Sequence, residues 1–262
     1  MRDGVIYVAT GADYLDLACA SAASLRTVEP ELPVDLFTDD TSAPGLGVFD
    51  RVHPVPRRHR RAKLDCMPLT RFERTLFLDC DTRVLAPLGD LFDVLERFEM
   101  ALAHDVRRAS ALVREGLEVA TPYAFPQLNS GVMLYRRSPG MLAFLAEWSR
   151  RFHDAGVARD QIILKDMLWR TELRFFVLPP EFNMRRVTML DAWEPLDATP
   201  TILHSHRLMD HMRRPGAPRI SDVADLVAQE RRALAAEWAA AGVGDDTVSR
   251  FAAVQSRGVS RE

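Results

Sequence analysis

With 262 residues, of which 47% are hydrophobic and 27% charged, the chain has the composition of an ordinary globular protein and is long enough for one sizeable α/β domain or two small ones. Its formal net charge of −3 gives no reason to expect nucleic acid as a partner. Cys19, Cys66 and Cys80 have neither the number nor the spacing of a disulfide framework or a zinc site. We find no signal region and no apolar run near the ~18 residues of a membrane span, so we expect a cytoplasmic protein.

The first part of the chain predicts a strand, a helix and a second strand. Residues 5–9 form an apolar run, residues 14–26 carry leucine and alanine at helical spacing, and residues 33–37 form another apolar run. This order opens a doubly wound sheet. Residues 41–61 contain proline, glycine and a basic cluster at 57–61. The basic cluster is either a solvated turn or a segment that meets phosphate.

The central stretch of the sequence is an apolar strand at 75–78 followed by two carboxylates, Asp79 and Asp81. An uninterrupted apolar run is typical of a strand covered on both faces of a parallel sheet, and ligands gather at the carboxyl ends of such strands. Residues two apart can face the same point. Two like charges held close together are unfavourable unless one is protonated or a cation lies between them, and Mg²⁺ or Mn²⁺ would meet that need. Acids at a strand end also form turns or helix caps, so the tripeptide alone leaves both roles open.

The rest of the chain alternates helices and strands, then ends in helix. We predict helices at 63–71, 90–98, 138–152 and 160–169, and strands at 100–103, 128–135, 174–178 and 201–206. Gly131, inside one of these strands, indicates a bulge or a close approach of the backbone to another group. The less regular segment 106–126 is expected to lie beside the substrate. From about residue 219 the composition predicts a helix at 224–241 and then a loosely ordered end.

Taken together, the order of these features resembles the family 8 glycosyltransferases, which are retaining enzymes with a GT-A fold. The matching motifs span about residues 4–206: Val8-Ala9-Thr10-Gly11-Ala12-Asp13-Tyr14-Leu15, the run from Arg74 to Thr82, Asn129-Ser130-Gly131-Val132, Asp160-Gln161 and a late strand ending in His204. Five motifs in the right order are much more specific than any one of them. The resemblance implies a GT-A (Rossmann-like) α/β domain at 1–216, with a mostly parallel sheet flanked by helices, and a helical C-terminal tail at 217–262.

The resemblance also implies roles for individual residues. Asp79, Asp81 and His204 would bind Mn²⁺ or Mg²⁺, and the imidazole favours Mn²⁺. The residues that would contact the nucleotide-diphospho-sugar donor are Thr10, Tyr14, Asp39, Lys63, Asp105, Asn129, Ser130 and His206. Gln161 would lie near the reacting carbon, and Asp160 is the acid that a double displacement would use as its nucleophile. We favour a front-face displacement, in which the leaving phosphate takes the proton of the acceptor hydroxyl.

One departure from the family affects the donor contacts. Family members often end with His-x-x-Gly-x-x-Lys-Pro-Trp, whose lysine holds the diphosphate, but the run that starts at His204 lacks the glycine and the Lys-Pro-Trp. Arg207, Arg213 or Arg214 could replace the lysine, because guanidinium binds phosphate well.

The expected function is therefore metal-dependent, retaining transfer of a sugar from a nucleotide diphosphate, most simply a UDP-sugar, to a hydroxyl group. One alternative is a haloacid-dehalogenase-type phosphatase, although that chemistry wants Thr or Val where Arg83 stands. Another is a non-catalytic protein that binds a nucleotide or a glycan. The tail could pack on its own domain, which we prefer, or form a homodimer.

Overall fold

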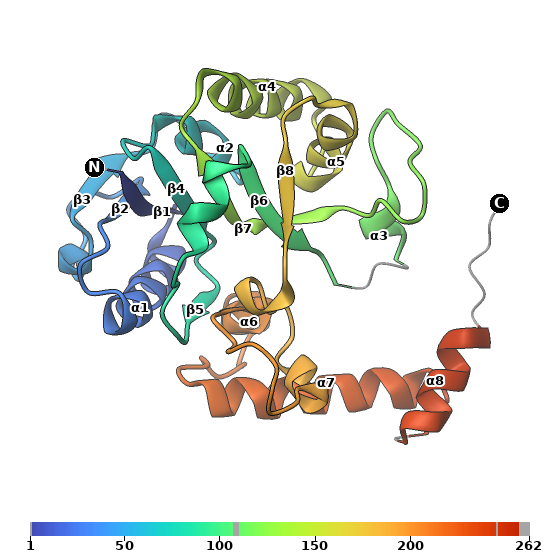
Figure 1. Ribbon diagram of the computed structural model, residues 1–262. Coiled ribbons are helices and arrows are strands. Elements are labelled where there is room, and N and C mark those ends of the chain that lie inside the picture. The colour runs from blue at the N-terminus through green and yellow to red at the C-terminus, as the bar shows by residue number, and fades with distance from the viewer. Residues whose placement is uncertain (1, 107–109, 245, 257–262) are drawn as a thin grey trace. The chain divides into compact units, whose positions relative to one another are not determined.

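The computed structural model describes residues 2–106, 110–244 and 246–256. Its contacts divide the chain into two compact units: Met1–Arg185 with Leu196–Ser205, and Arg186–Pro195 with His206–Glu262. The chain therefore passes from the first unit to the second and back before it enters the second unit for the remainder of its length. Figure 1 labels the α-helices and most of the strands of both units.

The first unit is built on a seven-stranded sheet within the described residues. In spatial order the strands are β3 (Arg51–Pro54), β2 (Val34–Thr38), β1 (Asp3–Ala9), β4 (Arg74–Leu78), β7 (Leu128–Arg136), β6 (Met100–His104) and β8 (Phe175–Leu178). Neighbouring strands are parallel except that β7 runs antiparallel to both β4 and β6. The sheet is therefore mostly parallel, as the sequence predicted, and β4 lies at its centre.

Helices cover both faces of this sheet because successive strand residues point to opposite sides. Ile6 of β1 belongs to the main apolar cluster together with residues of α2 (Lys63–Cys66), α4 (Pro139–Ala155) and α5 (Asp160–Arg170). Tyr7, the next residue of β1, faces α1 (Ala12–Val28) and hydrogen-bonds Ser21 at 3.0 Å. Figure 1 shows α1 on one side of the strands and α4 and α5 on the other.

Helix α4 shows how the sequence sets these elements. The Ser138 hydroxyl accepts a hydrogen bond from the Met141 amide at the N-terminus, and Gly156 ends the helix in the left-handed region, with φ 62°. Its buried face consists of Met141, Phe144, Leu145, Trp148 and Phe152. This periodic apolar face is the one that predicted the helix, and it packs in the main core.

A small second sheet brings a late strand beside the carboxyl end of β4. Strand β5 (Thr82–Val84) follows the two acids directly and pairs antiparallel with β9 (Ile202–His204), so that Thr82 lies opposite His204. The Ser205 amide also donates to the Asp81 carbonyl at 3.0 Å. Pairing of these two short strands is thus what brings residue 204 to the acids.

The second unit is helical. It contains η5 (Val187–Ala192), η6 (His206–Met209), α6 (Asp210–Arg213), α7 (Val223–Ala240) and α8 (Thr247–Ser256). The Asp222 carboxylate caps α7 by accepting from the Asp225 amide at 2.8 Å. Glu230 of α7 is buried and accepts from the Val187 amide at 2.9 Å, which fastens η5 to α7. The predicted helix at 224–241 is confirmed. The prediction of a loosely ordered end is wrong over 247–256, where α8 forms, and its last residues, 257–262, lie outside the described part of the chain.

Three further differences have local causes. The segment 41–61, for which the sequence predicted no strand, contains β3, a sheet-edge strand that pairs with β2 and tolerates Pro54. The helix expected at 63–71 is divided into α2 and the 3₁₀ turn η2 (Met67–Leu69), which contains Pro68. The helix expected at 90–98 is a 3₁₀ helix, η3 (Leu91–Glu96).

Three short elements complete the first unit: α3 (Ala111–Arg114), η1 (Leu46–Val48) and η4 (Pro180–Phe182). The segment 106–126, expected to lie beside the substrate, includes α3, and its residues 107–109 lie outside the described part of the chain. Among the residues that the structure describes, none of the helices combines the length and the apolar character that crossing a membrane would require.

Candidate metal centre

Three potential metal ligands converge where β4 leaves the sheet. The ligand atoms of Asp79, Asp81 and His204 all lie within 4.8 Å of one another. Asp81 and His204 are buried, with 6% and 3% of their surface exposed, and the Asp79 side chain is partly accessible. The structure therefore brings together the three residues that the sequence analysis selected as metal ligands.

Backbone contacts around the acids fix the turn that carries them. The Asp79 amide donates to the Gly131 carbonyl at 2.7 Å, and the Thr82 hydroxyl donates to the Asp79 carbonyl at 2.8 Å. A Cβ atom on Gly131 would lie 2.1 Å from His204 Cε1 and 2.6 Å from Asp79 Oδ2. The expected close approach at Gly131 is confirmed, since two of the potential ligands occupy the space that a side chain would need.

Hydrogen bonding around His204 leaves its Nε2 atom able to accept a cation. The Asn183 amide nitrogen donates to Asn129 Oδ1 at 3.1 Å, so the Asn183 oxygen faces His204 Nδ1, 2.9 Å away. An amide oxygen only accepts, so Nδ1 donates to it, and Nε2 is directed toward Asp81 Oδ1, 3.3 Å away. While the imidazole is protonated, Nε2 donates to Asp81, and loss of that proton would free its lone pair for a metal ion. Sequence reasoning missed Asn183, which lies at the end of a 3₁₀ turn and gives no local signal.

Nearby positive charge keeps the buried carboxyl groups ionised. Burial acts to raise the pKa of Asp81, but the charge and hydrogen bond of His204, together with Arg185, hold it below its usual value. Burial opposes ionisation of Asp105 as well, and Arg185, Gln161 and Asn129 lower its pKa. At neutral pH the centre thus offers carboxylate oxygens and an imidazole nitrogen. This donor set fits Mn²⁺ and also accepts Mg²⁺.

Lys63 links the centre to the start of α5. Its buried ammonium group lies 3.2 Å from Asp79 Oδ1 and 3.7 Å from Asp160 Oδ2, and it donates to both the carbonyl and the hydroxyl of Ser130 at 3.1 Å. The other Asp160 oxygen lies 3.1 Å from Arg61 Nε. Burial acts to raise the pKa of Asp160, but Lys63 and Arg61 hold it below its usual value. Sequence analysis identified Arg61 only as a member of a basic cluster and did not predict its ion pair with Asp160.

Asp105, Asn129 and Gln161 form a connected group. The Gln161 amide nitrogen donates to Asp105 Oδ2 at 2.9 Å and to the Leu128 carbonyl at 3.1 Å. The Asn129 amide nitrogen donates to the same Asp105 oxygen at 3.3 Å. Because Asn129 also contacts Asn183, this polar group is continuous with the surroundings of His204.

The residues predicted to contact the nucleotide occupy the ends of neighbouring parallel strands. Thr10 and Asp39 follow β1 and β2, and Asp39 accepts from the Gly11 amide at 2.8 Å. Arg58 lies 2.8 Å from the other Asp39 oxygen. Tyr14, in the first turn of α1, is 41% exposed. The base and ribose contacts of these residues stay predictions.

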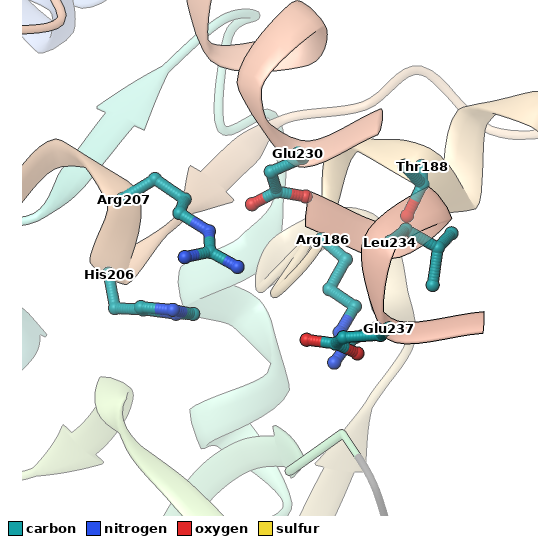
Figure 2. A pocket seen from close by; sticks show the side chains of 7 residues that line it. All are labelled: Arg186, Thr188, His206, Arg207, Glu230, Leu234 and Glu237. Atoms are coloured by element: carbon teal, nitrogen blue, oxygen red, sulfur yellow. The ribbon is translucent and has the colours of Figure 1, made fainter. Parts of the chain in front are cut away.

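His206 belongs to the second unit. There it lines a small pocket together with Arg186, Thr188, Arg207, Glu230, Leu234 and Glu237. Figure 2 shows these side chains around the pocket. The predicted role of His206 in donor binding likewise stays a prediction.

Comparison with solved structures relates the fold to those of known proteins. No protein-family model and no curated protein matches the sequence. Solved structures that match include the glycosyltransferase GlyE of Streptococcus pneumoniae TIGR4 (TM-score 0.53, 20% identity, 78% of this chain and 55% of that one). They also include LgtC, a galactosyltransferase in complex with donor and acceptor sugar analogs (0.54, 17%, 91% and 99%), and mouse xyloside xylosyltransferase 1 (0.53, 16%, 79% and 98%).

These matches establish the fold. The chain has the GT-A-like fold of LgtC, as the sequence predicted, and its structure matches those of glycosyltransferases across most of the chain. The chain spans only about half the length of GlyE.

Proposed function

We propose that this protein is a metal-dependent retaining glycosyltransferase that moves a sugar from a nucleotide diphosphate donor, most simply a UDP-sugar, to an acceptor hydroxyl. The observation that carries the proposal is the convergence of Asp79, Asp81 and His204 at the end of the central strand. The fold shared with LgtC, which was solved with donor and acceptor sugar analogs, supports it.

Asp79, Asp81 and His204 would hold Mn²⁺ or Mg²⁺. When bound, the ion supplies positive charge against the leaving diphosphate as the bond to the sugar breaks. Asp81 is ionised, and the hydrogen bond from His204 Nδ1 to Asn183 turns Nε2 toward Asp81, so the two groups already lie side by side for this role. The combination of imidazole and carboxylates favours Mn²⁺.

The surroundings of Asp160 favour a front-face displacement. A double displacement needs a carboxylate that is free to attack the sugar, but one Asp160 oxygen lies beside Arg61, and the other accepts from Ser130 and lies near Lys63. With 2% of its surface exposed, Asp160 is suited to accept hydrogen bonds more than to act as a nucleophile. In a front-face route the acceptor oxygen forms the new bond on the side that the phosphate leaves, and the phosphate takes the acceptor proton.

The polar group next to Asp160 has the chemistry of a sugar site. Asp105 and Asn129 offer carboxylate and amide groups to donor-sugar hydroxyls. The two hydrogen bonds made by the Gln161 amide nitrogen fix the orientation of its side chain. Its carbonyl dipole would then stabilise positive charge that develops on the reacting carbon.

A thermal-shift screen of nucleotide sugars, with and without Mn²⁺, tests this proposal. We expect a shift that needs both a UDP-sugar and the metal. Asp79→Ala and Asp81→Ala should each abolish metal-dependent turnover and leave the circular dichroism spectrum unchanged. Asp154→Ala, which removes an exposed acid on α4, is the matched control and should keep full activity. Full activity of either centre variant, or of the unaltered protein in excess chelator, would contradict the proposal. Release of phosphate from a generic phosphate ester would favour a phosphatase instead.

A further inference from the structure

A second group of metal-ligating side chains lies outside the centre described above. His59 precedes α2, Asp65 lies within α2, and His153 lies in the last turn of α4. Their ligand atoms are all within 4.8 Å of one another, and each residue is partly buried. We propose that His59, Asp65 and His153 form a second cation site, which binds a transition-metal ion of the Zn²⁺ type. The inference is independent of sugar transfer.

Asp65 lies between the two imidazole groups. Its Oδ2 atom is 2.9 Å from His59 Nε2 and its Oδ1 atom is 3.3 Å from His153 Nε2. The Ser149 hydroxyl, one helical turn before His153, donates to Asp65 Oδ1 at 2.5 Å and orients the carboxylate. Burial acts to raise the pKa of Asp65, but the hydrogen bonds from Ser149 and His59 lower it, so the group is ionised at neutral pH. Two imidazoles and one carboxylate are a common ligand set for zinc.

A positive group already lies against this cluster. Arg57 Nη2 is 2.5 Å from His153 Nε2 and 3.4 Å from Asp65 Oδ2. Because a guanidinium group keeps its protons, His153 Nε2 must accept this hydrogen bond, and its lone pair therefore faces Arg57 Nη2, which also lies next to Asp65. The Arg57 side chain is 59% exposed, so it can move into solvent when a metal ion takes its place. The cluster thus offers a lone pair and a carboxylate to a cation.

Metal binding would change one more contact. His59 Nδ1 accepts from the Arg61 amide at 3.3 Å, which places the His59 proton on Nε2, where it is donated to Asp65. An ion bound at Nε2 requires the tautomer that carries the proton on Nδ1, so the hydrogen bond from the Arg61 amide, which is already long, would be lost. Competition with Arg57 and with protons predicts that binding tightens when Arg57 is removed and weakens in acid.

The location of the cluster gives such an ion a structural consequence. Helix α2 contacts α4 in the first unit, and both helices lie on the same side of the sheet (Figure 1). The segment from His59 to Asp65 also carries Arg61 and Lys63, whose side chains reach Asp160 and Asp79. An ion shared by His59, Asp65 and His153 would fasten this basic segment to α4.

Zinc titration of the full chain tests the site once the first centre is removed by Asp79→Ala and Asp81→Ala. In that background, competition with a chromophoric chelator should give one Zn²⁺ per chain. His59→Gln and His153→Gln should each lower the affinity at least tenfold, and Arg57→Ala should raise it. His53→Gln removes a partly exposed histidine that pairs with Asp35, and this control should leave the affinity unchanged.

Two results would overturn the proposal: no zinc bound in the background protein, or an affinity that neither histidine change reduces. Circular dichroism of each variant without metal checks that it folds. If the histidine variants do not fold, Co²⁺ added to the background protein decides, because a site of nitrogen and oxygen ligands gives visible d–d absorption without thiolate charge-transfer bands. Absence of that absorption would equally overturn the proposal.

Discussion

Adding one methyl group at Gly131 should disable the metal centre. In Gly131→Ala the new Cβ atom would lie 2.1 Å from His204 Cε1, whereas carbon atoms in contact are about 3.5 Å apart, so the imidazole or the backbone must move by about 1.4 Å. The same atom would lie 2.6 Å from Asp79 Oδ2, so two of the three potential ligands are displaced together. Misplacement of reacting groups by about 1 Å can reduce a rate by about 100-fold.

We therefore expect Gly131→Ala to lower metal-dependent turnover by at least about 100-fold and to weaken Mn²⁺ binding. Overpacking of the buried strand should also destabilise the fold by about 1–3 kcal/mol. Turnover of nucleotide sugar, Mn²⁺ titration followed by electron paramagnetic resonance, and urea unfolding measure the three effects. Gly140→Ala is the matched control. Gly140 lies on the exposed side of α4, and its new Cβ would be in ordinary contact with Leu173, 3.4 Å away. If Gly131→Ala kept its Mn²⁺ affinity and turnover, the convergence of ligands described above would be refuted.

Other changes test the charges and thiols of the first unit. Lys63→Met should lower the free energy of unfolding in urea by about 3 kcal/mol, because it leaves the buried Asp160 carboxylate with one cation fewer. An unchanged midpoint of urea unfolding would contradict this role of Lys63. Because the folded-state pKa of Asp160 lies below its unfolded value, its contribution to stability is present above about pH 4 and is lost as the pH falls through the folded value. Asp160→Asn should therefore lessen the drop in unfolding free energy measured between about pH 6 and about pH 3, and an identical drop would argue against the ion pairs. Burial raises the pKa of Cys66 to about 12 and that of Cys80 well above its usual value. Iodoacetamide at neutral pH should therefore modify the partly exposed Cys19 first and the other two cysteines only after unfolding, which peptide mass spectrometry measures. Labelling of Cys66 in the native protein would contradict its burial.

The parts of the fold that the sequence predicted are those with strong local patterns. Strand β4 was predicted from its uninterrupted apolar run, and helix α4 from apolar residues that recur at helical spacing. Both elements formed where expected. Strand β3 gives no such pattern, because an edge strand buries little and can contain polar residues and Pro54. Its register depends on a distant contact, in which the Asp50 carboxylate accepts from the Val34 amide at 2.7 Å.

The same division holds for the candidate site. Asp79, Asp81 and His204 were predicted because they belong to short motifs that end strands. Asn183 and Arg185 were not, because their importance depends on side chains that the fold brings to them: Asn183 sets the proton position of His204, and Arg185 lowers the pKa of Asp81. Local sequence gives no sign of such contacts with the candidate metal ligands.

The path of the chain between the two units has a consequence for dissecting this protein. The stretch Leu196–Ser205, which carries His204, lies in sequence between the two segments of the second unit, Arg186–Pro195 and His206–Glu262. A fragment that stops at residue 185 lacks β9 and, with it, the candidate metal ligand His204. Because the segments of the two units alternate along the chain, no single truncation leaves both units intact, and neither unit can be expressed as one continuous piece of the sequence.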